Sequence, residues 1–93
     1  MEFTHNKNQI ALYTEDGKLL AEITFPNIND KTVDINHTFV DQSLRGQGIA
    51  GKLMEELIQE LENRNLTAIP TCSYAVKWFE KHPEHGNLLN QAG

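Results

Sequence analysis

The chain has 93 residues, of which 39% are hydrophobic and 23% charged, and its formal net charge is −5. These proportions are typical of one folded domain, so we expect a single domain over residues 1–93. The negative charge disfavours nucleic acid as a partner, and no apolar run is long enough to span a bilayer, so no membrane partner is expected. A single cysteine excludes an internal disulfide, and the absence of metal-finger spacing predicts no metal. With no visible signal peptide, the expected location is cytoplasmic.

The first half of the chain alternates between apolar and polar residues, which predicts an antiparallel meander. Residues 10–13 form a short apolar run, and the dipeptide Asp16-Gly17 suits a tight turn after it. Residues 18–25 and 32–40 then alternate with a period of two, as in strands with one buried face. In the last stretch the apolar face is formed by Val33, Ile35, His37 and Phe39. His37 is therefore predicted to face the core.

The second half changes to helical periodicity. Apolar residues recur every three or four positions over residues 48–63, which predicts an amphipathic helix. Residues 66–69 are a short buried strand, expected to lie parallel to the strand at 32–40 because a helix separates the two. A second helix is predicted over Ser73–Lys81, and the polar tail at 84–93 is expected to be loose. The expected fold is a truncated α+β (mixed α/β) domain, an antiparallel meander followed by a β-α-β-α half.

A glycine-rich loop, Arg45-Gly-Gln-Gly-Ile-Ala-Gly-Lys52, joins the third strand to the first helix. Converging N–H groups and a helix N-terminus favour phosphate binding at such a loop. Two nucleotide-binding motifs, the dinucleotide fingerprint and the P-loop, match some residues of this loop, and both are rejected. The dinucleotide fingerprint lacks an acidic residue about 20 positions on, and the P-loop pattern is followed by Leu53, which cannot bind magnesium. ATP and NAD are therefore not expected to compete with the ligand of this loop.

A third motif, Arg45-x-x-Gly48-x-Ala50, resembles motif A of the GNAT superfamily of N-acetyltransferases. The expected order of strands and helices around it fits the same family. Residues 72–81 resemble a second family pattern, Asn-x-x-Ala-x-x-x-Tyr-Glu-Lys, on the last helix. The resemblance covers residues 32–83, and the length is similar to that of the smallest single-domain members.

The resemblance implies acetyl-CoA as the donor and as the co-substrate that the loop binds. Its pyrophosphate would lie on the backbone N–H groups of Arg45, Gly46, Gln47, Gly48, Ile49 and Ala50. Its pantetheine arm would lie beside the strand residues Thr38, Phe39 and Val40, and N–H groups near the last two would stabilise the oxyanion. The implied partners are acetyl-CoA and an amine acceptor, a small molecule or a protein amine.

The residues that could carry the chemistry depart from the family pattern. Phe79 stands where many members have the tyrosine that protonates the leaving thiolate, and Cys72 stands where they have asparagine. Tyr74 is the nearest substitute acid. Cys72 is predicted at a helix start, which favours a nucleophilic thiolate, so one hypothesis is transient acetylation of Cys72. Histidines titrate near neutral pH, so His37 is a candidate base for the amine or for Cys72.

The function expected from these features is acetyl-CoA-dependent N-acetylation of an unidentified amine, direct or through Cys72. A non-catalytic acyl-CoA-binding or protein-interaction module is the alternative. Phe79 and the shortness of the chain favour that alternative, because both remove parts that the resemblance associates with turnover.

Overall fold

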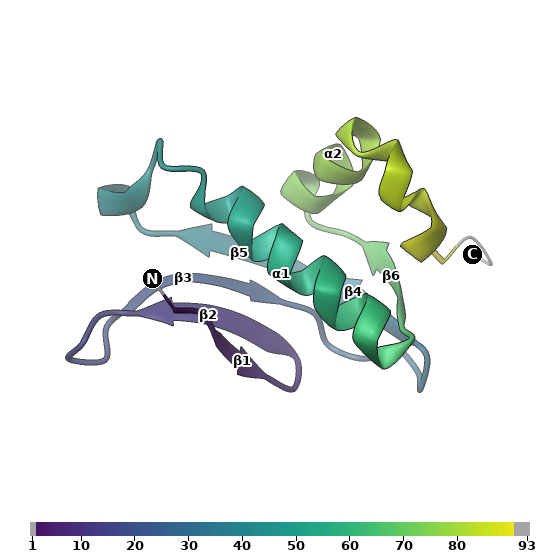
Figure 1. Cartoon of the computed structure of the whole chain (residues 1–93), viewed down its shortest axis with the longest axis horizontal. Helices are drawn as coiled ribbons and strands as arrows, with labels where there is room; N and C mark the ends of the chain where they lie inside the picture. The colour runs from purple at the N-terminus through teal and green to yellow at the C-terminus, as the bar shows by residue number, and fades with distance from the viewer. Residues whose placement is uncertain (1, 91–93) are drawn as a thin grey trace.

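The computed structural model describes residues 2–90 and confirms a mixed α+β fold with a truncated GNAT-like order of elements (Figure 1). Strands β1 (Thr4–Asn6), β2 (Gln9–Tyr13), β3 (Leu19–Thr24) and β5 (His37–Val40) pair in that order, all antiparallel. Strands β4 (Thr32–Ile35) and β6 (Thr67–Pro70) form a separate parallel pair. The helices are α1 (Ile49–Arg64) and α2 (Ser73–Lys81), with 3₁₀ turns η1 (Gln42–Leu44) and η2 (Pro83–Leu88).

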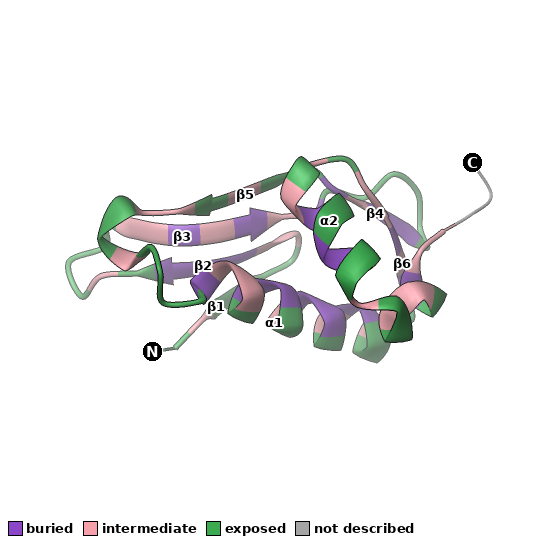
Figure 2. Cartoon of the chain, turned by 90° about the horizontal axis from the view of Figure 1, so that it is seen from above, coloured by how far each residue is buried: buried purple, intermediate pink, exposed green. Residues whose placement is uncertain are grey.

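Helix α1 covers one face of the four-stranded sheet. Six apolar residues at helical spacing point from α1 into the core: Ile49, Leu53, Met54, Leu57, Ile58 and Leu61. They meet the alternating buried residues of β2 and β3, among them Ile10, Ala21 and Ile23, which are fully buried. The solvent side of α1 is exposed, and within residues 2–90 neither view shows a helix on the other face of this sheet (Figures 1 and 2).

The strand predicted at 32–40 is two strands, because a β-bulge at Asn36 divides it. Asn36 and His37 both lie opposite Thr24, whose carbonyl accepts the Asn36 N–H at 3.2 Å and whose hydroxyl donates to the Asn36 side chain at 2.6 Å. The extra residue reverses the alternation of side chains. Val33 and Ile35 remain buried, but His37 is exposed, so the prediction that His37 faces the core is wrong.

At the bulge the chain loses its pairing with β6, which opens the sheet on that side. Before the bulge, β4 pairs in parallel with β6, as predicted, and Val33 also forms an antiparallel bridge with Asn27 just after β3; after the bulge, β5 pairs with β3 alone. The end of β4 stays joined to the segment that follows β6, because the carbonyl of Ile35 accepts the N–H groups of Thr71 and Cys72 at 3.0 and 3.1 Å. Beyond this point β5 and the start of α2 diverge (Figure 1), and a pocket bordered by Val40 of β5 and Tyr74 of α2 lies between them. We call the space between these two elements the slot.

The end of the chain is more ordered than expected. Residues 83–88 form η2, Leu88 is only 6% exposed in the core, and Leu89 bridges to Ala68 of β6. The predicted loose tail is therefore wrong for residues 84–90, because these apolar groups complete the core beside β6; residues 91–93 lie outside the described part. Within residues 2–90 no helix has the length and apolar character that crossing a membrane requires.

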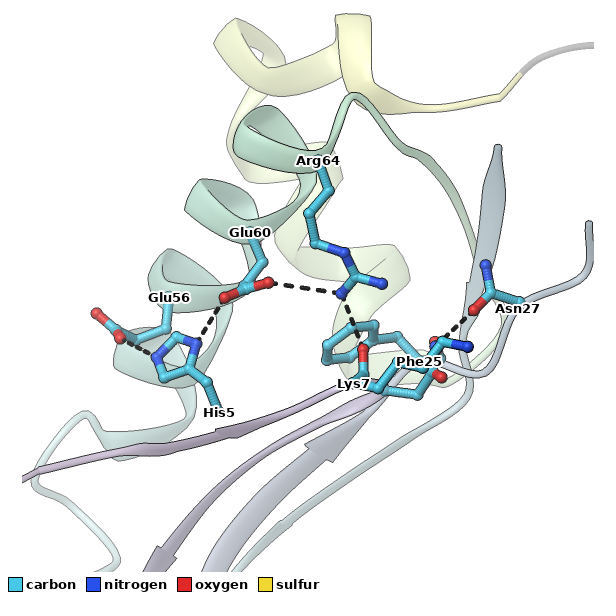
Figure 3. A network of polar contacts seen from close by, with 8 residues as sticks. His5, Lys7, Phe25, Asn27, Glu56, Glu60 and Arg64 are labelled. Atoms are coloured by element: carbon cyan, nitrogen blue, oxygen red, sulfur yellow. Dashed lines mark hydrogen bonds and ion pairs between the residues drawn. The ribbon is translucent and has the colours of Figure 1, made fainter. Parts of the chain in front are cut away.

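The C-terminal half of α1 is fastened to the first hairpin by a polar network (Figure 3). His5 of β1 contacts two carboxylates of α1, with Nε2 2.7 Å from Glu56 and Nδ1 2.9 Å from Glu60. Arg64 donates to the backbone carbonyl of Lys7 at 2.8 Å and lies 3.5 Å from Glu60. This network fixes the end of α1 that lies away from the glycine loop.

Candidate functional site

The glycine loop between η1 and α1 depends on two glycines with positive φ. Gly46 has φ 84° and Gly48, the residue that caps α1, has φ 71°. Other L-residues rarely adopt this conformation, and here it turns the chain so that the first N–H groups of α1 face outward. The cap supplies no side-chain hydrogen bond, and the first turn of α1 contains no acidic residue. The positive end of the helix is therefore left uncompensated.

The backbone N–H groups of this loop divide into two sets. Those of Arg45 and Gln47 donate within the η1 turn, each at 3.3 Å, so the prediction that all six N–H groups face a ligand is wrong for these two. No acceptor among residues 2–90 takes the N–H groups of Gly46, Gly48, Ile49, Ala50 and Gly51. Four of these five belong to the predicted set, and Gly51 adds one more. Such converging free donors are what a pyrophosphate requires.

These free donors border a pocket of about 330 Å³. It is lined by Val40, Leu44, Arg45, Gly46, Gly48, Ile49, Ala50, Gly51 and Tyr74. The pocket thus brings together the end of β5, most of the predicted loop and the predicted acid Tyr74. The other predicted site residues do not line it: Gln47, Thr38, Phe39, Cys72 and His37. Sequence reasoning missed Leu44 and Gly51. Gly51 stands in the glycine-rich stretch of the sequence, but the structure does not require a glycine there, because a β-carbon would lie at an ordinary contact distance of 3.9 Å from the Tyr74 hydroxyl.

A second hollow of about 370 Å³ continues from this pocket between the two helices. Gly51 and Tyr74 line both, and the second is also lined by Glu55, Lys77, Trp78, Lys81 and His82. Lys77 and Lys81 give this second hollow positive charge, which the carboxylate of Glu55 offsets in part. The sequence alone offered no reason to prefer these lysines over ordinary exposed helix charges.

The free edge of β5 presents backbone groups to the slot. The N–H of Asp41 donates to Leu20 of β3 at 2.6 Å, which sets the alternation of the ladder. Hydrogen-bonded residues alternate along an antiparallel pair, so Phe39 faces β3 whereas Thr38 and Val40 direct their N–H groups to the free edge. Of the two residues predicted to donate near the oxyanion, Val40 has the suitable direction and Phe39 does not.

Cys72 is the N-cap of α2 and lies where the chain is still joined to the end of β4, outside the lining of the glycine-loop pocket. Its Sγ accepts the N–H of Ala75 at 3.4 Å, and its own N–H is held by Ile35 beside the bulge. The thiol is half-buried and unpaired with another cysteine. The predicted position at a helix start is confirmed.

Tyr74 and Phe79 have opposite surroundings. Phe79 is only 5% exposed within the core, and its side chain has no proton to donate. Tyr74 lines both hollows, and burial, followed by the neighbouring Cys72 thiol and Glu55 carboxylate, raises the pKa of its hydroxyl. A raised pKa keeps the hydroxyl protonated, which is the form that a proton donor needs.

His37 lies near the slot but on the face of the sheet away from α1. Its Nε2 is 3.4 Å from Oε2 of Glu22 on the neighbouring strand β3. The sequence suggested His37 as a base either for the amine or for Cys72. Among the described residues, no contact joins the His37 side chain to Cys72. Glu22 was not identified from the sequence, because the reversal at the bulge is what places it beside His37.

Comparisons with known proteins agree with this geometry. The sequence model of the GCN5-related N-acetyl-transferase family matches residues 9–88. Protein NATD1 of Xenopus tropicalis is 33% identical over 83 residues, which cover 89% of this chain and 76% of that protein. Protein NATD1 of Homo sapiens is 30% identical over 63 residues, covering 68% of this chain and 56% of that protein.

Solved structures share the fold. The solution structure of a GCN5-like protein from Staphylococcus aureus superposes with a TM-score of 0.79 at 27% identity, covering 99% of this chain and 90% of that one. Rv2747 from Mycobacterium tuberculosis, solved with CoA and NLQ, shares the fold with a TM-score of 0.64 at 18% identity, covering 83% of this chain and 48% of its own. The chain therefore belongs to the GCN5-related N-acetyltransferase family.

Proposed function

We propose that this chain transfers the acetyl group of acetyl-CoA to an amine. The observation that carries the proposal is the set of free N–H groups at Gly46, Gly48, Ile49 and Ala50, which border a pocket at an uncompensated helix N-terminus. They would hold the pyrophosphate, with Arg45 adding a charge-assisted contact and Lys77 and Lys81 lying further along the groove.

The thioester would lie in the slot beside the free edge of β5. The N–H of Val40 would stabilise the carbonyl oxygen as it gains charge, as oxyanion donors do. The neutral amine attacks the carbonyl carbon, the new C–N bond forms, the C–S bond breaks, and coenzyme A leaves as a thiolate. Tyr74, protonated and bordering both hollows, would give its proton to that thiolate. His37 would remove a proton from the acceptor before attack.

A two-step route through Cys72 is part of the same proposal. Its Sγ would take the acetyl group with release of coenzyme A, and the amine would then displace the Cys72 thiolate. The half-buried thiol at the start of α2, next to the slot, supports this route. Intact mass after incubation with acetyl-CoA tests it: an added acetyl group that Cys72→Ala abolishes is expected. Full turnover in Cys72→Ala without a labelled wild type would leave only direct attack.

An amide chemical-shift titration with acetyl-CoA tests the whole proposal. We expect shifts at residues 38–50 and 72–74, together with thiol release when amines are added. ATP and NAD serve as competitors and should displace little acetyl-CoA. Shifts confined to another surface would contradict the assignment.

A non-catalytic acyl-CoA-binding module is the second candidate, favoured by the burial of Phe79 where many relatives have a reactive tyrosine. Tight binding of acetyl-CoA without thiol release on any amine would support it. Tyr74 makes catalysis the better-supported function, because it brings a protonated hydroxyl to the same pocket.

A further inference from the structure

A row of polar side chains crosses three strands on the face of the sheet that α1 does not cover. Gln9 of β2 donates from Nε2 to Oε1 of Glu22 on β3 at 2.8 Å. The other carboxylate oxygen, Oε2, is 3.4 Å from Nε2 of His37 on β5. The Glu22 side chain is only 19% exposed, whereas that of His37 is 53% exposed. In this row the Glu22 carboxylate is held in place by Gln9, and the imidazole of His37 is accessible to solvent.

The β-bulge places His37 on the same face of the sheet as Glu22 and Gln9. On β5, Thr38 and Val40 pair with Ile23 and Ala21, so their side chains share the core face under α1. His37 and Phe39 consequently point to the opposite face, and His37 stands directly at the bulge where β5 leaves β4. The glycine-loop pocket contacts the slot on the helix side. His37 lies on the other face of the sheet, at the end of β5 next to the bulge.

We propose that the acceptor amine reaches the thioester from this uncovered face, and that Glu22 is the positioning residue that orients His37 as its base. The proposal rests on the proposed function. The contact with Glu22 favours a proton on Nε2 of His37, which leaves the lone pair on Nδ1. Gln9 holds the other oxygen, so the carboxylate cannot easily turn away.

The protons balance in this arrangement. Nδ1 of His37 takes one proton from the ammonium form of the acceptor, which makes the nitrogen nucleophilic, and later releases that proton to water. The nitrogen attacks the carbonyl carbon, the C–S bond breaks, and Tyr74 protonates the leaving thiolate. The nitrogen's second proton then passes to solvent, and water returns a proton to Tyr74. The net products are the amide, free coenzyme A and one released proton.

The test measures thiol release from acetyl-CoA with tyramine, spermidine and a short lysine peptide as acceptors. His37→Ala should lower kcat by about 100-fold, the lower end for a general base, with the KM for acetyl-CoA unchanged. Added imidazole should restore part of that kcat, because the exposed site can admit it. Glu22→Gln should lower kcat about 10-fold at unchanged KM, without rescue by imidazole. His5→Gln is the matched control, since His5 also lies beside carboxylates but far from the slot, and should keep full kcat.

Each outcome decides something. A wild-type protein that turns over none of these amines removes the proposed function, and the base assignment with it. A wild type that turns over, with His37→Ala equally active or with its loss unrelieved by imidazole, removes only the assignment of His37. A raised KM at unchanged kcat in Glu22→Gln would give Glu22 a role in binding and not in positioning.

Discussion

The two ends of helix α1 are built in opposite ways. The N-terminal end begins after Gly48 with no side-chain cap and no acidic residue in its first turn, and its first N–H groups have no acceptor among residues 2–90. The C-terminal end is closed by Asn65 in the left-handed conformation, φ 55°, whose N–H donates to Glu62, while the N–H of Leu66 donates to Leu61 at 2.9 Å. This is the Schellman arrangement, and its two apolar positions, Leu61 and Leu66, are both buried in the core.

The side chains extend the contrast. At the C-terminal end, Arg64 and Glu60 tie α1 to the first hairpin through Lys7 and His5. At the N-terminal end, the side of the helix opens on a pocket. The orphan backbone groups of a helix end can be satisfied by the protein, by water or by a ligand, and here only the C-terminal end uses protein partners. The other end is the one at which we propose that coenzyme A binds. Stability is thus concentrated at the end where the proposed ligand does not bind.

An acidic residue in the first turn should separate stability from binding. Ala50→Asp places a carboxylate at the positive helix end, which should stabilise the fold by about 0.3–1 kcal/mol. The same carboxylate would face the proposed pyrophosphate, and like-charge contact costs several kcal/mol, so CoA affinity should fall by about 100-fold or more. Thermal unfolding and calorimetric titration with CoA measure the two effects.

The control for that substitution is Ala50→Asn, which has nearly the same size without the charge. It should lose far less affinity than Ala50→Asp. Equal losses in the two variants would mean that bulk, not charge, is what the loop excludes. An undiminished CoA affinity in Ala50→Asp would contradict the placement of the pyrophosphate.

A second prediction compares two glycines with positive φ. Gly48→Ala and Gly17→Ala both force a β-carbon into the left-handed region, and in neither case does that carbon meet another atom within 4 Å. Each should therefore cost about 1–2 kcal/mol of stability from backbone strain alone. Only Gly48→Ala should also weaken CoA binding, by about 10-fold, because it shifts the N–H groups that line the pocket. If both variants bind CoA as the wild type does, the loop geometry is not what holds the ligand.

Some of the features that these experiments test could be predicted from the sequence, and others could not. The helices were predictable because apolar periodicity is local: α2 has the predicted bounds Ser73–Lys81, and α1 is displaced by one residue from the predicted 48–63. The position of the glycine loop between a strand and a helix was also predictable, because the change from a period of two to helical periodicity falls on either side of it. Which of its N–H groups remain free was not predictable, since the η1 turn engages those of Arg45 and Gln47.

The bulge is the feature that sequence patterns concealed. Apolar residues and His37 alternate with polar residues without interruption across Asn36. The sequence pattern is therefore that of one continuous strand. The break depends on Thr24, a residue of another strand that engages Asn36 through both its carbonyl and its hydroxyl. Tertiary contacts of this kind override local pattern, and here they decide which face His37 occupies.

The closed end of α1 offers a third prediction. Asn65→Ala should cost about 1 kcal/mol, because alanine lacks the tolerance of asparagine for the left-handed conformation. Asn65→Gly should be nearly neutral, since glycine is the usual residue at this position. Both should bind CoA like the wild type, as chemical denaturation and titration can show. A loss of CoA affinity in Asn65→Ala would mean that the two ends of the helix are coupled.

The smallest expected effect is a pH dependence at the fastened end. Hydrogen bonding to Glu56, followed by the Glu60 contacts, raises the pKa of His5 above its usual 6.5, although partial burial opposes this. The protonated form is therefore favoured by folding, so its contribution is fully present below pH 6.5 and is lost as the pH rises through the raised value. Exposed ion pairs contribute at most about 1 kcal/mol, and salt should weaken this one. Chemical denaturation from pH 6 to 8.5 should show a decline in the free energy of unfolding, and His5→Gln should flatten that decline. The control is His85→Gln, which removes a histidine stacked on Trp78 and should leave the decline unchanged. An unchanged slope in His5→Gln would mean that another group governs the decline.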